Sequence, residues 1–157
     1  MTRRGHSLIE LTIVVMLVAT IAVIAVPRYT RSLERYRVDA AARRVVADLA
    51  YARTQARLVG QSRTVTFNLA KSAYTISDVR GLRDDGGPYE VVIADEPYSA
   101  SIQSVALGEP TDLDDDPAVV QFNGYGVPDG GGNVVVQSGD LSRTVVVDAG
   151  TGEAVVQ

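Results

Sequence analysis

An unbroken apolar stretch near the N-terminus constrains this chain more than any other feature. Every residue from position 11 to position 26 is apolar or threonine, and Leu8 and Ile9 extend the stretch on its N-terminal side. A helix over these residues, rising about 1.5 Å per residue, would cross most of a hydrocarbon layer of ~30 Å. The stretch therefore predicts a membrane-spanning helix.

Glu10 places one carboxylate at the start of this stretch, shortly after Arg3 and Arg4. An ionised side chain in lipid is costly unless it reaches the interface or pairs with an opposite charge. An acidic residue inside a membrane helix is therefore a functional candidate by default, and a passive glutamate at the membrane interface is the alternative.

The order of a short basic leader, Gly5, His6, Glu10 and the apolar stretch resembles the N-terminus of type IV pilins and of the pseudopilins of type II secretion. The resemblance implies that a prepilin peptidase cuts after Gly5 on the cytoplasmic side and that the new amine of His6 is N-methylated. It also implies that Glu10 pairs with the N-terminal amine of a neighbouring subunit, which replaces two isolated charges in lipid by one ion pair. Family members usually carry Phe after the cut, whereas this chain has His6.

An ordinary secretory signal peptide is the competing interpretation of the same segment. Arg3 and Arg4 would form its basic end, and Val23-Ile24-Ala25 would offer a small-residue cleavage site. Two features count against it, since Glu10 interrupts the start of the apolar region and the helical pattern continues beyond the proline at position 27.

The distribution of charge conflicts with the topology that the leader implies. Nine arginines and three acids lie between residues 28 and 63, whereas four basic and fifteen acidic residues follow from residue 66 onward. The arginines directly after the apolar stretch outnumber Arg3 and Arg4, so a count of positive charge would place the body in the cytoplasm. The leader resemblance takes precedence here, and it implies a single-pass protein of the inner membrane with its C-terminal domain in the periplasm or outside.

Beyond Pro27 the pattern becomes that of an amphipathic helix that ends at Gly60. Pro27 cannot donate a backbone N–H, so it predicts a kink or a loosened turn between two helical segments. Gly60 supplies the positive φ with which helices commonly end. Apolar residues between them recur at alternating steps of four and three, which indicates a helix packed on one side: Val38, Ala42, Val45, Leu49, Ala52, Ala56 and Val59.

After Gly60 the period changes to two, which is typical of strands. Turns rich in glycine and aspartate are spaced like those of an antiparallel meander, and Gly130-Gly131-Gly132 is interpreted as a hairpin turn. We therefore expect an α+β, pilin-like fold in which a long N-terminal helix, half membrane and half amphipathic, packs on antiparallel β-sheets. The expected strands cover residues 64–67, 74–76, 89–93, 102–107, 119–122, 134–136, 144–147 and 154–156.

Later motifs sharpen the resemblance toward the GspH/FimT branch of the superfamily, whose members are minor components of a filament. They comprise the segment 49–56 leading to Val65-Thr66-Phe67, Val120-Gln121-Phe122-Asn123 with Gly126, and the segment 143–147 before Thr151-Gly152. The resemblance implies four parts: a leader peptide at residues 1–5, a transmembrane helix with the methylation motif at 6–27, an amphipathic continuation at 28–59 and an antiparallel β domain at 60–157.

The resemblance implies a structural subunit and no enzyme, and the composition agrees. The single histidine is His6, cysteine is absent, and no Gly-rich phosphate loop leads from a strand into a helix. We expect no cofactor. The expected role is a minor pseudopilin of a type II secretion system, and the alternative is a FimT-like minor type IV pilin involved in pilus assembly or DNA uptake.

The expected partners follow from that role. They are other pilin or pseudopilin subunits through the N-terminal helix, the prepilin peptidase, the assembly platform of the inner membrane and a secreted protein substrate. DNA is less favoured, because it requires an exposed basic patch and the β half is acidic. The Arg-rich helix face has other uses, since it can pair with lipid headgroups, with neighbouring subunits or with Glu34, Asp39 and Asp48.

Two further groups of residues leave alternatives open. An acidic loop contains carboxylates of the kind that ligate Ca²⁺, but its spacing lacks the ligand positions of an EF-hand, so a solvated loop is favoured and no metal is expected. Tyrosines near loops are interpreted as core or rim residues by default, with partner contacts as the alternative. The loop residues are Asp112, Asp114, Asp115 and Asp116, and the tyrosines are Tyr89, Tyr98 and Tyr125.

Overall fold

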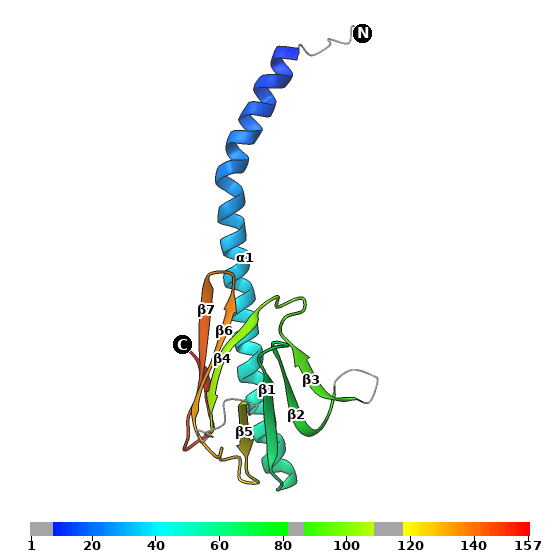
Figure 1. The fold of residues 1–157 in the computed structure, drawn as a ribbon, viewed down its shortest axis with the longest axis vertical. Coiled ribbons are helices and arrows are strands. Elements are labelled where there is room, and N and C mark those ends of the chain that lie inside the picture. The colour runs from blue at the N-terminus through cyan, green and yellow to red at the C-terminus, as the bar shows by residue number, and fades with distance from the viewer. Residues whose placement is uncertain (1–7, 82–86, 109–117) are drawn as a thin grey trace. The chain divides into compact units, whose positions relative to one another are not determined.

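The computed structural model describes residues 8–81, 87–108 and 118–157. It divides into two units, Met1–Leu33 and Glu34–Gln157. Within the described residues, one helix is followed by eight strands: α1 (Leu8–Val59), β1 (Arg63–Asn68), β2 (Ala73–Arg80), β3 (Pro88–Val92), β4 (Ser101–Leu107), β5 (Ala118–Phe122), β6 (Gly132–Ser138), β7 (Leu141–Val147) and β8 (Ala154–Val156). Each strand expected from the sequence is present, and most are extended by one or more residues, so the α+β prediction is confirmed (Figure 1).

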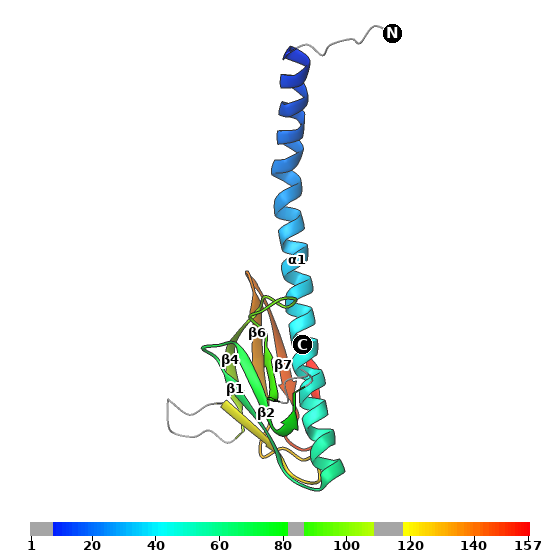
Figure 2. The same ribbon diagram turned by 90° about the vertical axis from the view of Figure 1, so that its right-hand side faces the viewer.

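The described strands form two antiparallel sheets, as expected. One sheet has the order β3-β2-β1-β5 and the other has the order β4-β6-β7-β8. Consecutive strands pair as in a meander from β1 to β3 and from β6 to β8, whereas β5 returns to pair with β1 and β4 pairs with β6. Both sheets pack against the part of α1 that follows residue 33 (Figures 1 and 2).

The glycine run at positions 130–132 was misinterpreted as a hairpin turn. It carries the chain from β5 in one sheet to β6 in the other. Gly132 already belongs to β6 and has a φ of +152°, and a Cβ placed on it would overlap the carbonyl of Ala106 in β4. Glycine is therefore required because the two backbones approach closely at this point.

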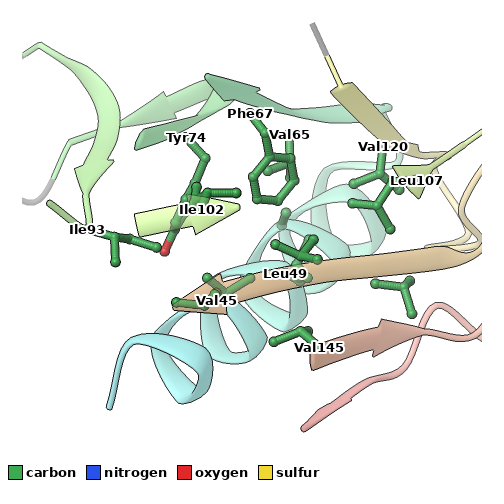
Figure 3. Close-up of a cluster of buried hydrophobic side chains, with 14 of the residues drawn as sticks. Val45, Leu49, Val65, Phe67, Tyr74, Ile93, Ile102, Leu107, Val120 and Val145 are labelled. Carbon is green, nitrogen blue, oxygen red and sulfur yellow. The ribbon is translucent and has the colours of Figure 1, made fainter. Parts of the chain in front are cut away.

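The apolar stripe of α1 forms the centre of the core, as expected. Its residues from Val38 to Ala56 are at most 1% exposed, and Ala41 joins them. Figure 3 shows Val45 and Leu49 among inward-facing side chains of both sheets. The prediction failed only for Val59, which is 50% exposed because it lies in the last turn before α1 ends at Gly60 with a φ of +67°.

Candidate functional site

The first unit presents an apolar helical surface with no covering. Its large apolar side chains between Leu8 and Val23 are 50% to 83% exposed. The most hydrophobic window of α1 has a mean hydropathy of 2.7, and by length and composition the helix is able to cross a membrane. Such a surface is stable in lipid or against other apolar helices, and it is unfavourable in water.

The two threonines of this segment satisfy their own hydroxyl groups. Thr12 Oγ1 donates to the carbonyl of Ile9 at 2.8 Å, and Thr20 Oγ1 donates to the carbonyl of Met16 at 2.8 Å. Neither hydroxyl needs a partner outside the helix, which lowers the cost of placing it in lipid.

Glu10 stands apart from its surroundings, because it is the one charged residue between positions 8 and 27. It is exposed on the first turn of α1, and none of the ion pairs among the described residues includes it. A carboxylate near the N-terminus of a helix interacts favourably with the helix dipole. Within the described residues, Glu10 therefore carries a charge that no ion pair neutralises.

Several sequence-predicted residues are not tested by the structure. Gly5 and His6 lie outside the described residues, and so do Asp112, Asp114, Asp115 and Asp116. α1 is continuous through position 27, and the kink at Pro27 stays a prediction. Among the residues that are described, no group of histidine, aspartate or glutamate side chains could hold a metal ion.

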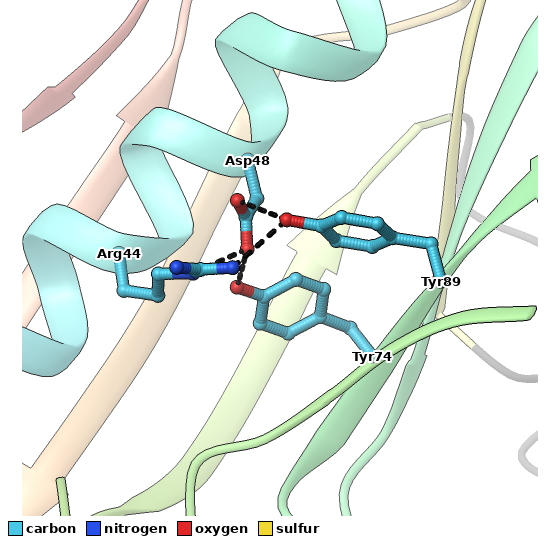
Figure 4. A network of polar contacts seen from close by, with 4 residues as sticks. All are labelled: Arg44, Asp48, Tyr74 and Tyr89. Atoms are coloured by element: carbon cyan, nitrogen blue, oxygen red, sulfur yellow. Dashed lines mark hydrogen bonds and ion pairs between the residues drawn. The ribbon is translucent and has the colours of Figure 1, made fainter. Parts of the chain in front are cut away.

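The second unit contains a buried polar cluster around Asp48 that joins α1 to the first sheet (Figure 4). Asp48 is 5% exposed and accepts three hydrogen bonds. The donors are Arg44 Nε at 2.9 Å, the Tyr74 hydroxyl at 2.5 Å and the Tyr89 hydroxyl at 2.7 Å. Arg44 Nη2 also donates to the Tyr89 hydroxyl at 2.9 Å, and the ring of Tyr51 lies 5.7 Å from that of Tyr89 between centroids.

The environment of this cluster shifts three pKa values. Burial raises the pKa of Tyr89 to about 12, and the hydrogen bond to Asp48 adds to the effect. Burial and the Asp48 carboxylate also raise the pKa of Tyr74 far above its ordinary value. Burial alone would lower the pKa of Arg44, but attraction to Asp48 outweighs it and raises that pKa. At neutral pH both phenols of the cluster therefore keep their protons and act as hydrogen-bond donors.

This cluster joins structural elements, since Arg44 and Asp48 lie in α1 and the two tyrosines lie in β2 and β3. The sequence indicated only part of it. Pairing of helix arginines with Asp48 was expected and is confirmed by Arg44, but the tyrosines were missed. The spacing along the helix could have indicated that Asp48 is buried, because it lies three residues after Val45 and four before Ala52, on the buried side of the helix.

Other arginines of the basic helix region also make internal contacts. Arg57 Nε donates to the Tyr125 carbonyl at 2.7 Å, and Arg63 is only 6% exposed. Asp39 accepts from Arg143 Nε of β7 at 2.7 Å instead of pairing along the helix. The exposed basic face is thus smaller than the arginine content suggests.

The three loop tyrosines have separate environments. Tyr89 is buried in the core, as the default interpretation held, and Tyr98 is partly buried against the core. Tyr125 is 83% exposed, so it remains open to a partner.

Comparison with known proteins identifies the fold. Residues 41–151 match the family model described as type II transport protein GspH. The minor pseudopilin EpsH of the type 2 secretion system of Vibrio cholerae has a similar structure, with a TM-score of 0.53 and 15% identity over 77% of this chain and 96% of that one. The type IV minor pilin FimU of Pseudomonas aeruginosa strain PAO1 gives a TM-score of 0.50 and 17% identity over 79% and 90%. Among curated protein sequences, none matches significantly.

Proposed function

Since the chain belongs to the GspH family, we propose that it is a minor pseudopilin of a type II secretion system. Its fold and family are those of pilin-like minor subunits, which are structural components. In this role it would form part of a periplasmic pseudopilus that helps to export folded proteins. The observation that carries the proposal is the exposed apolar helix with the lone Glu10 at its start, joined to a domain of the GspH family.

The proposed maturation assigns a role to each part of the chain. A prepilin peptidase removes residues 1–5, and residues 6–27 anchor the mature chain in the inner membrane. Residues 28–59 continue the helix, and residues 60–157 form the β domain on the periplasmic side. The new amine of His6 is N-methylated.

Glu10 is the proposed assembly residue. In a lone subunit its exposed carboxylate lies on a helix whose other side chains in this stretch are apolar or threonine. When helices pack side by side, it pairs with the N-terminal amine of His6 in a neighbouring subunit, and each charge then neutralises the other. Because unpaired charges in lipid are costly, the pair favours the assembled state and fixes the axial register.

A minor type IV pilin is the second candidate, favoured by the likeness to FimU. In that case the chain takes part in pilus assembly or, like FimT, in DNA uptake. The internal use of Arg44, Arg57 and Arg63 makes DNA the less favoured partner. A secreted β domain with an ordinary signal peptide is the lesser alternative.

The first experiment is the intact mass and N-terminal sequence of the protein purified from its native membrane. A chain that starts at a methylated His6 supports the proposal, and Gly5→Ala should then leave the leader attached. A chain that starts near residue 26 contradicts it and favours the signal peptide.

Incorporation into filaments tests Glu10 directly. Glu10→Ala should leave the chain folded and membrane-inserted but should reduce its recovery in sheared filaments. Thr12→Ala is the matched control, because the Thr12 hydroxyl is satisfied by Ile9 within its own helix. Equal incorporation of the two variants would remove Glu10 from the mechanism.

The choice of machine requires neighbours to be identified. Cysteine is absent from the chain, so a single cysteine placed at Thr12 gives one defined cross-linking position in the apolar helix. Mass spectrometry of its cross-linked products should recover pseudopilins under the first proposal and pilins under the second.

A further inference from the structure

A groove runs along the outer edge of β3. It has a volume of about 310 Å³ and is lined by all five residues of β3, by Arg44 of α1 and by Asp95, Glu96 and Tyr98. Side chains of consecutive strand residues point to opposite faces of a sheet. A groove that contacts five in succession therefore follows the edge of the strand and not one of its faces.

The edge of β3 that lines this groove is unpaired. Among the described strands, β3 is the terminal member of its sheet and pairs only with β2 (Figure 1). In an antiparallel pair, the backbone N–H and C=O groups of alternate residues point toward the neighbouring strand. The Ile93 N–H donates to the Ser72 carbonyl at 2.9 Å, so the backbone groups of Tyr89 and Val91 also face β2. Those of Glu90 and Val92 then face the groove. Such an edge is a template for another strand.

The segment after β3, which contributes Asp95, Glu96 and Tyr98 to the groove, is held in place by its own hydrogen bonds. The Asp95 carbonyl accepts from the N–H groups of Tyr98 at 3.1 Å and Ser99 at 2.9 Å. The N–H of Ala100 donates to the Ile93 carbonyl at 3.1 Å and closes the segment. A ligand would therefore meet a groove that is already formed, which lowers the cost of binding.

The charge of the groove is negative. Glu90, Asp95 and Glu96 line it and are exposed. Among the described residues that line the groove, Arg44 is the one cation, and it donates to the buried Asp48 at 2.9 Å and to the Tyr89 hydroxyl at 2.9 Å, as Figure 4 shows. Within this described lining, the three exposed carboxylates therefore have no free cation beside them, and they complement a lysine or arginine side chain of a ligand.

From the open edge, the fixed segment after β3 and this charge, we propose that the β3 groove docks an extended basic peptide segment of a partner protein. The segment adds as a strand beside β3, with hydrogen bonds to the backbone of Glu90 and Val92. Its lysine or arginine side chain pairs with Asp95 and Glu96. This docking is independent of the role of Glu10, because the two sites are in different units of the chain.

The test measures binding of a labelled peptide, acetyl-Ser-Thr-Val-Lys-Val-Thr-Ser-amide, to the full-length chain in detergent micelles by fluorescence anisotropy. We expect binding that weakens about tenfold when the lysine is replaced by glutamate and about tenfold when both valines are N-methylated. Amide hydrogen exchange should slow at Glu90 and Val92 in the complex.

Variants of the chain locate the site. Asp95→Asn with Glu96→Gln should weaken binding about tenfold, whereas Glu153→Gln, in the turn before β8, should not. Glu90→Pro should prevent strand addition while keeping the ladder to β2, because residue 90 directs its N–H away from that ladder. Equal affinity for the lysine and glutamate peptides, undiminished binding by the doubly substituted chain, or no binding at millimolar peptide would each overturn the proposal.

Discussion

The Tyr74 hydroxyl donates to Asp48 Oδ2 at 2.5 Å, which joins the first sheet to the middle of α1 inside the core. Both residues are almost fully buried, and Asp48 receives two further donors, Arg44 and Tyr89. A buried carboxylate is tolerated only when its charge and lone pairs are satisfied, so this cluster fixes how the helix and the sheet are aligned.

Removing Asp48 should therefore destabilise the second unit strongly. Asp48→Ala leaves two buried hydroxyl groups and one arginine without their acceptor, and we expect a loss of about 3 kcal/mol or more in the free energy of unfolding. Tyr74→Phe removes one hydrogen bond to a charged group and should cost about 1.5–3 kcal/mol. Urea unfolding of the full chain in micelles, followed by near-UV circular dichroism, measures both.

Asp39 provides the matched control for that experiment. Like Asp48, it lies in α1 and pairs with an arginine, here Arg143 at 2.7 Å. The side chain of Asp39 is 35% exposed, whereas that of Asp48 is 7% exposed. An ion pair whose carboxylate stays partly open to solvent contributes less, so Asp39→Ala should cost no more than about 1 kcal/mol. A loss as large as that of Asp48→Ala would contradict the importance assigned to burial.

The raised tyrosine pKa values predict a loss of stability in alkali. Unfolded tyrosine has a pKa of about 10. In the folded chain the pKa of Tyr89 is raised to about 12, and that of Tyr74 is raised as well. Between pH 10 and pH 12 the unfolded chain has released protons that the folded chain retains, so the free energy of unfolding falls as pH rises. Well below pH 10 both tyrosines keep their protons in the folded and the unfolded chain, so neither makes the free energy of unfolding depend on pH.

Tyr89→Phe isolates one contribution to this pH dependence. The variant should have a shallower decline of the free energy of unfolding between pH 10 and pH 12 than the parent chain. The ultraviolet difference titration of the two proteins should place the ionisation of Tyr89 near pH 12. An ionisation near pH 10 in the folded state would show that the hydroxyl is not held by Asp48.

Two leucines of α1 should respond differently to the same substitution. Leu49 is 1% exposed and Leu58 is 73% exposed. Leu49→Ala creates a cavity between the two sheets and should cost about 2–5 kcal/mol, whereas Leu58→Ala should change the free energy of unfolding by less than about 0.5 kcal/mol. Chemical denaturation of the two variants, measured side by side, checks the core assignment independently of the polar cluster.

Local sequence pattern predicted the elements of this fold but not all their neighbours. Alternation and turn residues are local signals, so the eight strands were found near their observed positions. The pairing of β5 with β1 brings Val65 opposite Val120 across a long intervening segment, and no local signal encodes that choice. The meander pattern is therefore interrupted at β4 and β5.

The same distinction applies to the candidate sites. Glu10 was evident because a charge inside an apolar run stands out without any knowledge of tertiary structure. The tyrosine partners of Asp48 could not be predicted, because they come from two strands whose register is fixed only when the sheet forms. The β3 groove depends in the same way on which strand ends at the edge of its sheet.

The loop after β5 depends on a close approach between two glycines. A Cβ placed on Gly124 would lie 2.7 Å from the carbonyl oxygen of Gly60, which is backbone and cannot rotate away. Gly124→Ala should push the loop off the end of α1 and weaken the 2.7 Å hydrogen bond from Arg57 to Tyr125, at a cost of about 1–3 kcal/mol.

Two glycine controls separate this clash from backbone strain. Gly60 itself has a φ of +67° but open space around its Cβ position, so Gly60→Ala should cost only the conformational penalty of about 1 kcal/mol. Gly150 has neither a positive φ nor a close neighbour, since Asp148 Oδ1 is 3.6 Å from its Cβ position. Gly150→Ala should therefore be within about 0.5 kcal/mol of the parent chain. If Gly124→Ala unfolds at the same urea concentration as Gly150→Ala, the loop is not anchored to the helix end, and the exposed Tyr125 that it carries is not held in a fixed position for a partner.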